Sequence, residues 1–291
     1  MRETRYRDPA PNASEIAARL GLHRARRGWR GTCPVCSYRD ALALDERAGK
    51  TLIWCANGCP QGALAVLLRG AGGLPESKPE RLPRLDRADP DARRRRARAV
   101  WDSTSPLTPG CPAALYLGKR RIAHVIESPA LRWRTDTPHP AGGRRIALIA
   151  AIAGPDGSLQ GVHRIFLKPD GSKADVEPQK ASLGIVAGGA VRLQSCSAEL
   201  AVAEGLESAA SAGAILGLPA WSAISAGNLA RSMILPPEIR SVVIAADHDA
   251  PGLRAAEDAA VRWRDEGRVV DIFRASERGC DANDILLRPR P

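Results

Sequence analysis

Two pairs of closely spaced cysteines limit most strongly what the first part of this chain can fold into. The pairs are Cys33-Pro-Val-Cys36 and Cys55-Ala-Asn-Gly-Cys59, with eighteen residues between them. Each spacing suits a tight turn, and two such turns at the ends of a short hairpin place four thiolates around one tetrahedral ion. The sequence therefore predicts a zinc ribbon in which Cys33, Cys36, Cys55 and Cys59 hold structural Zn²⁺.

The residues around these pairs favour the same interpretation. Ala41–Leu44 and Thr51–Trp54 are typical of β-strands, and the polar segment 45–50 separates them as a turn would. Two disulfide bonds are the alternative, but they require an oxidising compartment, and no apolar segment follows the basic N-terminus as in a signal peptide. No apolar run approaches the ~18 residues of a membrane span. We therefore expect a cytoplasmic protein without membrane contact.

Charge is distributed unevenly along the 291 residues, whose formal net charge is +11. Residues 1–100 carry a net charge of +10, residues 101–200 carry +4 and residues 201–291 carry −3. A basic surface attracts a polyanion such as nucleic acid, whereas clustered carboxylates suit a cation. The alternative is an arginine-rich surface that is only solvated, and charge alone does not decide between the two.

The last third of the chain alternates between strand-like and helical segments. Short apolar strands are expected at 200–203, 220–224, 241–246 and 269–273, with helices at 206–216 and 252–266. This alternation predicts an α/β fold with a parallel sheet flanked by helices. Before it, strands at 145–153 and 159–167 flank the turn-forming segment 154–158, which predicts a β-hairpin in an α+β subdomain. A helix is expected near the N-terminus over residues 14–28.

Acidic residues follow two of the expected parallel strands. Glu204 and Gly205 end the first strand, and Asp247 and Asp249 follow the third. The carboxyl ends of parallel strands open on one edge of a sheet, where ligands bind. Carboxylate oxygens suit Mg²⁺ or Mn²⁺, with substrate phosphate and water completing the shell. Gly252 allows the backbone to approach a phosphate near a helix N-terminus.

A second acidic pair, Asp281 and Asp284, follows the fourth strand and is predicted to reach the same edge and the same metal ion. Either residue can instead cap the last helix, and for Asp284 the two interpretations are equally favoured.

The acidic motifs resemble the Toprim signature of bacterial-type (DnaG-like) primases, topoisomerases and related nucleases. The matching residues are Glu204-Gly205, Asp247-x-Asp249 with Gly252, and Asp281-x-x-Asp284. The ribbon is similar to the zinc-binding domain that opens primase chains, although many primases use three cysteines and one histidine. Residues 161–164 and 179–184 resemble the segment that precedes Toprim in primase-like proteins of phages and mobile elements. The resemblance covers most of the chain and is weakest over residues 70–140.

The resemblance implies four parts: a zinc-ribbon DNA-binding domain over residues 1–72, a linker over 73–92, a basic N-terminal subdomain of the catalytic core over 93–195, and a Toprim catalytic domain over 196–291. It implies synthesis of short RNA primers from NTPs on a single-stranded DNA template. Metal ions on the catalytic residues Glu204, Asp247 and Asp249 would assist nucleotidyl transfer. By the same analogy, nucleotide or template contacts are expected from Lys180, Arg164, His163, Gly205 and Gly252.

The expected ribbon holds aromatic residues beside arginines, an arrangement that binds single strands by stacking bases. Trp54 is nevertheless expected to pack in the ribbon's own small core. A P-loop motif is absent from the sequence, so a replicative helicase would act in trans. Two further hypotheses remain open: a Toprim-type nuclease that hydrolyses phosphodiesters with similar carboxylates, and a replication accessory protein without catalytic activity.

Overall fold

The chain divides into two compact units, Met1–Arg84 and Leu85–Pro291. The structure, a computed structural model, describes residues 12–25, 28–35, 40–47, 50–55, 59, 61–70, 89–196 and 198–288. The expected linker over residues 73–92 lies outside these ranges except for residues 89–92. Within the described ranges, no helix is both long enough and apolar enough to cross a membrane.

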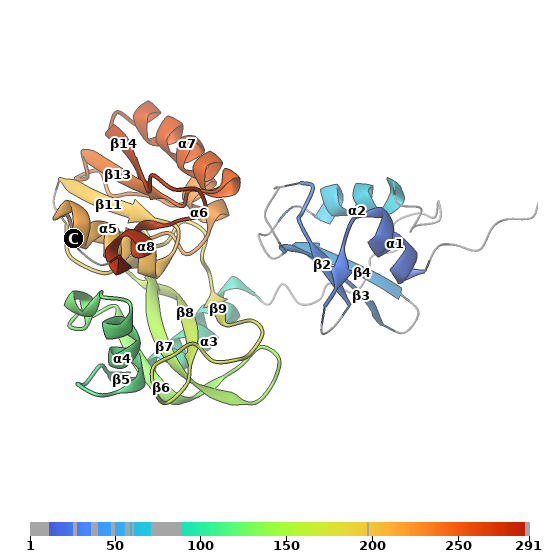
Figure 1. The fold of residues 1–291 in the computed structure, drawn as a ribbon, viewed down its shortest axis with the longest axis horizontal. Coiled ribbons are helices and arrows are strands. Elements are labelled where there is room, and N and C mark those ends of the chain that lie inside the picture. The colour runs from blue at the N-terminus through green and yellow to red at the C-terminus, as the bar shows by residue number, and fades with distance from the viewer. Residues whose placement is uncertain are drawn as a thin grey trace, which may run out of the picture. The chain divides into compact units, whose positions relative to one another are not determined.

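A four-stranded antiparallel sheet forms the centre of the first unit, in the order β1-β2-β3-β4 (Figure 1). Leu44 and Ile53 face each other across the third and fourth strands and pack with Ile16 and Leu64 of the helices. The predicted hairpin between the cysteine pairs is confirmed, with longer strands than expected. The elements are α1 (Ala13–Arg19), β1 (His23–Arg24), β2 (Trp29–Gly31), β3 (Leu42–Arg47), β4 (Lys50–Cys55) and α2 (Gln61–Gly70).

Helix α1 ends earlier than the sequence suggested. It begins with a capping box in which Asn12 Oδ1 accepts from the Glu15 amide at 3.0 Å and the Glu15 carboxylate accepts from the Asn12 amide. At its other end Gly21 has φ 65°, a left-handed conformation that ends the helix. The Leu22 amide donates back to Ala17 O, and β1 follows. The prediction of one helix over residues 14–28 is therefore wrong.

The second unit begins with a subdomain built on a five-stranded antiparallel sheet, in the order β5-β6-β7-β8-β9. The predicted hairpin around residues 154–158 is confirmed: the Gly154 amide donates to Ser158 O at 2.8 Å, and Gly157 has φ 81°. The elements are α3 (Pro90–Asp102), β5 (Ser105–Pro106), α4 (Pro112–Lys119), the 3₁₀ turn η1 (Ala123–Val125), β6 (Leu131–Pro138), β7 (Arg144–Ala153), β8 (Leu159–Leu167) and β9 (Lys180–Gly184).

A second five-stranded sheet follows, in the order β10-β12-β11-β13-β14. Strands β12, β11, β13 and β14 are parallel, as the alternating pattern predicted, whereas the edge strand β10 runs antiparallel to β12. The elements are β10 (Val191–Arg192), β11 (Glu199–Ala203), α5 (Leu206–Leu216), β12 (Ala220–Ser222), α6 (Ala226–Arg231), β13 (Ser241–Ala246), α7 (Ala250–Asp265), β14 (Val269–Arg274) and α8 (Ala282–Leu287).

The two sheets of the second unit share one hydrophobic core. Alternate residues of β7 point to opposite faces of its sheet, so Leu148 and Ile152 face that core while Ala147 and Ile149 face α3. The shared core continues through α4 into β11 and α5. In Figure 1 the parallel sheet and its helices lie above the antiparallel sheet of the same unit. This common core holds the carboxyl ends of β11 and β13 in place relative to the subdomain.

Candidate functional site

Three predicted carboxylates follow neighbouring strands of the parallel sheet. Ala203, the last residue of β11, pairs with Ala245 of β13, so Glu204 and Asp247 leave the sheet from adjacent strands at the same edge. Asp249 follows two residues after Asp247 and is the N-cap of α7. The structure therefore brings these residues to one edge, as the sequence predicted.

Asp247 is the electrostatic centre of this edge. Burial, together with the negative charges of Glu204, Asp281 and Asp249, raises the pKa of Asp247 to about 7. Its Oδ1 atom is buried and has no hydrogen-bond partner among the described residues. A buried carboxylate oxygen without a donor, surrounded by further carboxylates, fits a divalent cation. Glu204, Asp247, Asp249 and Asp281 are thus the candidates to hold Mg²⁺ or Mn²⁺. Among the described residues, no three of these carboxylates have oxygens within 4.8 Å of one another, so they would have to move closer together around a cation.

Asp281 and Asp284 have different environments. They form a capping box at the start of α8, with the Asp284 amide donating to Asp281 Oδ1 at 2.9 Å and the Asp281 amide donating to Asp284 Oδ2 at 3.0 Å. Asp281 Oδ2 also accepts from Ser208 Oγ at 3.0 Å, and the charge of Asp281 raises the pKa of Asp247. Asp284 therefore has the capping role that the sequence left open, and its place as a metal ligand stays a prediction.

Ser208 is a site residue that the sequence analysis missed. It lies in the first turn of α5, four residues after Glu204, and its hydroxyl donates a hydrogen bond to Asp281. A hydrogen bond from Ser208 also lowers the pKa of Asp247, although burial has the larger, opposite effect. The signal available in the sequence was its position four residues after Glu204 on a predicted helix. Ser208 connects the carboxylates of two separate segments.

Replacing Asp247 by asparagine is expected to stabilise the metal-free protein. An aspartate whose folded-state pKa is about 7 binds a proton more tightly when folded than when unfolded, so its contribution to stability falls as the pH rises from about 4 to 7. Asparagine stays uncharged at every pH, so the variant does not lose stability in this way. Its free energy of unfolding should exceed that of the wild type by up to about 4 kcal/mol above pH 7.

Thermal denaturation followed by circular dichroism at pH 4 and pH 8, without divalent cations, measures this difference. The two melting temperatures should lie close together at pH 4, where Asp247 is protonated in the folded wild type and about half protonated in the unfolded chain. A difference that is the same at both pH values would contradict the prediction.

Gly252 is required by close packing in the first turn of α7. Its amide donates to Asp249 Oδ1 at 2.7 Å, and a Cβ atom placed on Gly252 would lie 2.6 Å from the backbone oxygen of Asp247. The glycine thus lets the turn between Asp247 and Asp249 close tightly.

Gly252→Ala is expected to lower the free energy of unfolding by about 1–3 kcal/mol, because the added methyl group overpacks this turn. Gly118 in α4 is a matched control: a Cβ atom there meets nothing within 4 Å, so Gly118→Ala should stabilise the protein slightly through helix propensity. Urea denaturation of both variants checks this. If both variants changed the free energy of unfolding equally, the close contact of Gly252 with the Asp247 backbone would not be the cause.

Lys180 lies beside a buried carboxylate that the sequence analysis did not single out. Its Nζ atom is 2.8 Å from Oε1 and 2.9 Å from Oε2 of Glu207. Lys173 Nζ lies 3.5 Å from the same Oε1, and the Tyr116 hydroxyl donates to it. These four side chains (Tyr116, Lys173, Lys180 and Glu207) are called the lysine cluster below. Glu207 belongs to α5, and its three partners belong to the subdomain.

Arg164 and His163, two residues expected to contact nucleotide or template, lie in the interior of the subdomain. Arg164 is buried, and its guanidinium donates to Pro138 O at 2.8 Å and to Ala181 O at 3.3 Å, so it joins the backbones beside β8. His163 is buried with its Nδ1 3.0 Å from Ser182 Oγ. Burial, with Lys180 nearby, lowers the pKa of His163 to about 3, so the imidazole is neutral. A contact of either side chain with nucleotide or template stays a prediction.

Three of the four predicted zinc ligands converge in the first unit. The Sγ atoms of Cys33, Cys55 and Cys59 lie within 4.8 Å of one another, with Cys33 and Cys59 3.8 Å apart. All three cysteines are buried and none forms a disulfide bond. Cys36 lies outside the described residues. A buried set of three thiols fits Zn²⁺, which binds thiolates in structural sites.

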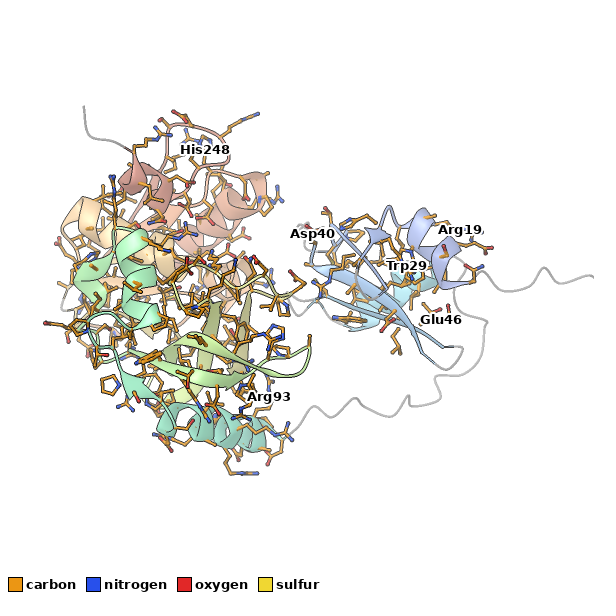
Figure 2. The ribbon with its side chains drawn as sticks, turned by 60° about the horizontal axis from the view of Figure 1, so that its bottom comes forward. Arg19, Trp29, Asp40, Glu46, Arg93 and His248 are labelled. Atoms are coloured by element: carbon orange, nitrogen blue, oxygen red, sulfur yellow. The ribbon has the colours of Figure 1, made fainter. Side chains whose placement is uncertain are left out.

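Trp54 was expected to pack in the ribbon core, but it does not. It is 37% exposed, because it alternates along β4 with the buried residues Ile53 and Cys55. Ala43 pairs with both Trp54 and Arg30, so the three residues form one row on the sheet face away from the core. Trp29, labelled in Figure 2, belongs to the other face because it pairs with the core residue Leu44. The Arg24 guanidinium lies 4.5 Å from its ring centroid.

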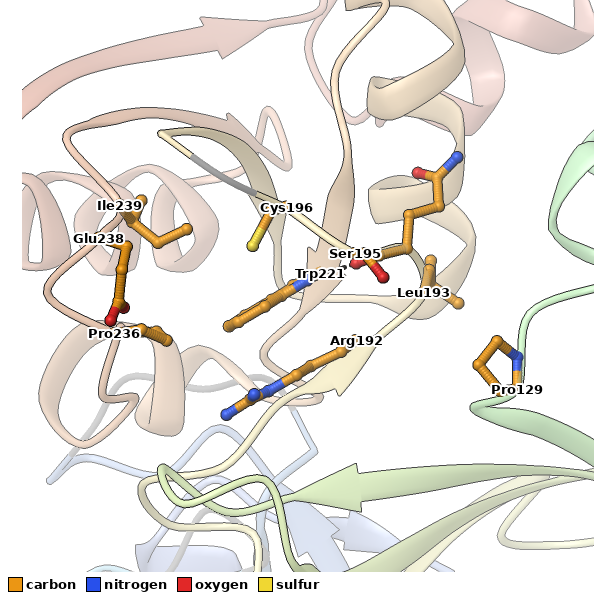
Figure 3. A pocket seen from close by; sticks show the side chains of 10 residues that line it. Pro129, Arg192, Leu193, Ser195, Cys196, Trp221, Pro236, Glu238 and Ile239 are labelled. Atoms are coloured by element: carbon orange, nitrogen blue, oxygen red, sulfur yellow. Dashed lines mark hydrogen bonds between the residues drawn. The ribbon is translucent and has the colours of Figure 1, made fainter.

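A cavity of about 430 Å³ lies elsewhere on the parallel sheet (Figure 3). Glu238 and Ile239, which precede β13, line the cavity together with Arg192 and Trp221. The side chains of Arg192 and Trp221 stack, with the guanidinium 4.5 Å from the ring centroid. The cavity is therefore at the amino end of β13, whereas Asp247 follows its carboxyl end. It is separate from the carboxylate edge.

Two family models match consecutive parts of the second unit. Residues 91–193 match a domain of unknown function (DUF7146), and residues 199–289 match the Toprim domain. The chain matches no curated protein.

Several solved structures are similar to the chain. The catalytic domain of the DnaG primase bound to single-stranded DNA is 16% identical, with 68% of this chain and 74% of that chain covered and a TM-score of 0.44. The primase fragment of the bacteriophage T7 primase-helicase protein is 14% identical (89% and 93% covered, TM-score 0.43). The zinc-binding and RNA polymerase domains of the Aquifex aeolicus primase are also 14% identical (94% and 79% covered, TM-score 0.46).

Proposed function

Because residues 199–289 are a Toprim domain, we propose that the protein is a primase that synthesises short RNA primers on single-stranded DNA. The observation that carries this proposal is the buried, unpartnered Oδ1 of Asp247 among the carboxylates of Glu204, Asp249 and Asp281. Such an edge fits a divalent cation beside a phosphate. The thiol cluster upstream and the basic charge of residues 1–200 support a nucleic-acid substrate.

In the proposed reaction, the 3′-hydroxyl of one nucleotide attacks the α-phosphate of the next. A new P–O bond forms, the hydroxyl proton passes to solvent water, and the bond to pyrophosphate breaks with its electron pair on the leaving group. Bound Mg²⁺ or Mn²⁺ would stabilise the negative charge that develops on the phosphate oxygens. Glu204, Asp247 and Asp249 would hold the cation, and the hydroxyl of Ser208 holds Asp281 by a hydrogen bond.

The template is proposed to bind on the open face of the ribbon sheet. Trp54 is exposed there in one row with Arg30. An aromatic ring beside a cation binds single strands because bases stack on the ring while the cation approaches the phosphates.

The test is incubation of the protein with single-stranded DNA, NTPs and Mg²⁺ or Mn²⁺, with labelled nucleotide and labelled DNA followed separately. Short RNA products that require template support the proposal. Shortened DNA without incorporation of nucleotide would instead indicate a Toprim-type nuclease. Binding of DNA with neither reaction would indicate an accessory protein without catalytic activity.

A further inference from the structure

The lysine cluster has an excess of positive charge in a partly buried place. Glu207 supplies one negative charge, and its side chain is only 7% exposed. Two ammonium groups contact it, those of Lys180 and Lys173. Tyr116 adds no charge, because burial and Glu207 raise its pKa above the usual range. The cluster therefore carries a net positive charge of one when both lysines are protonated.

The two lysines share Glu207 unequally. Lys180 Nζ lies within 3 Å of both carboxylate oxygens, which is the geometry of a close ion pair. Lys173 Nζ reaches a single oxygen at 3.5 Å. Burial, followed by the repulsion of Lys180, lowers the pKa of Lys173, so an additional anion at this ammonium group would relieve an unfavourable charge. The excess positive charge therefore belongs to Lys173.

The lysine cluster lies next to the carboxylate edge. Glu207 follows Glu204 by three residues in the first turn of α5. A Cβ atom placed on the intervening Gly205 would lie 3.9 Å from Glu207 Oε2 and 3.5 Å from Ser208 Oγ, and Ser208 bonds Asp281. The first turn of α5 thus lies next to carboxylates that suit a cation and, through Glu207, next to ammonium groups that suit an anion. A nucleoside triphosphate with its divalent cation has both of these charges.

We propose that Lys173 contacts the phosphates of the bound nucleotide, while Lys180 is held by Glu207 as a fixed structural ion pair. This inference rests on the proposed primase function and changes the role expected for Lys180, which the resemblance had assigned to nucleotide or template binding. Lys173 lies in the loop between β8 and β9 and keeps 24% of its side chain exposed, so a phosphate can reach it.

The decisive experiment measures binding of inorganic tripolyphosphate by isothermal titration calorimetry at low salt, without divalent cations. Lys173→Met should raise the Kd about tenfold, whereas Lys173→Arg should retain binding. Lys168→Met is the matched control in the same loop, because Lys168 pairs with the exposed Asp175 at 2.7 Å, and its Kd should equal that of the wild type. In primer synthesis, Lys173→Met should raise the KM for NTP about tenfold with kcat nearly unchanged.

Lys180→Met should mainly lower the melting temperature, because it leaves the buried Glu207 with only the weaker ion pair to Lys173 and the hydrogen bond from Tyr116. The inference is overturned if Lys173→Met binds tripolyphosphate like the wild type, or if the wild type does not bind it. It is also overturned if folded Lys180→Met alone loses binding. Tripolyphosphate binding that depends on Lys173 in a protein that makes no primers would refute the primase proposal and leave this inference standing.

Discussion

Asp247→Ala is expected to abolish template-dependent primer synthesis while the protein stays folded. Asp247 lies at the centre of the carboxylate edge, and its unpartnered Oδ1 is the atom best placed to bind a cation. Loss of that cation removes several kcal/mol of transition-state stabilisation, and each 1.36 kcal/mol is a factor of ten in rate. We therefore expect incorporation of labelled NTP to fall at least a thousandfold.

The structure also predicts that this loss is not a folding defect. Removal of Asp247 relieves the repulsion among Glu204, Asp249 and Asp281, so the variant should melt at a higher temperature than the metal-free wild type. Asp258→Ala is the control, since Asp258 is an exposed residue of α7 away from the edge, and its activity should be unchanged. Primer synthesis by folded Asp247→Ala at more than a tenth of the wild-type rate would refute the catalytic role of this edge.

The carboxylate edge was predictable from the sequence because it depends on local patterns. Apolar strands that end in Glu204 and Asp247 are visible as short runs, and parallel strands necessarily place their carboxyl ends on one side of a sheet. The hairpin of the ribbon and the turn at residues 154–158 follow from similar local signals. Each strand or turn follows from one stretch of the chain, and the parallel arrangement of the strands then brings Glu204 and Asp247 to the same edge.

The lysine cluster was not predictable in this way because its members come from distant segments. Glu207 lies in the first turn of α5, while Lys173 precedes β9 and Lys180 is its first residue, and only the shared core brings them together. The burial of Arg164 depends likewise on the strands that pair around it. The exposure of Trp54 depends on which face of the ribbon sheet α1 and α2 cover, which periodicity alone does not specify.

Cys55→Ser is expected to unfold the first unit and leave the second unit folded. The described core of the first unit is small and includes the cysteines themselves, so Cys33, Cys55 and Cys59 pack with residues such as Ile16 and Leu64. Structural Zn²⁺ in such modules contributes on the order of 10 kcal/mol, more than a core of this size supplies alone. The cores of the second unit contain none of these residues.

Native mass spectrometry should find one Zn²⁺ per wild-type chain and none in Cys55→Ser. Denaturation followed by circular dichroism should show two transitions for the wild type and one for Cys55→Ser. A strong chelator should remove the same transition from the wild type. Cys280→Ser is the control, because Cys280 is half-buried in the second unit, and it should keep both its zinc and its two transitions.

Single-stranded DNA binding should weaken when the ribbon unfolds, because the face that carries Trp54 and Arg30 exists only when the sheet is folded. A zinc-free chain that keeps both transitions would refute the metal site, since three buried thiols would then be stable without the ion that explains their convergence.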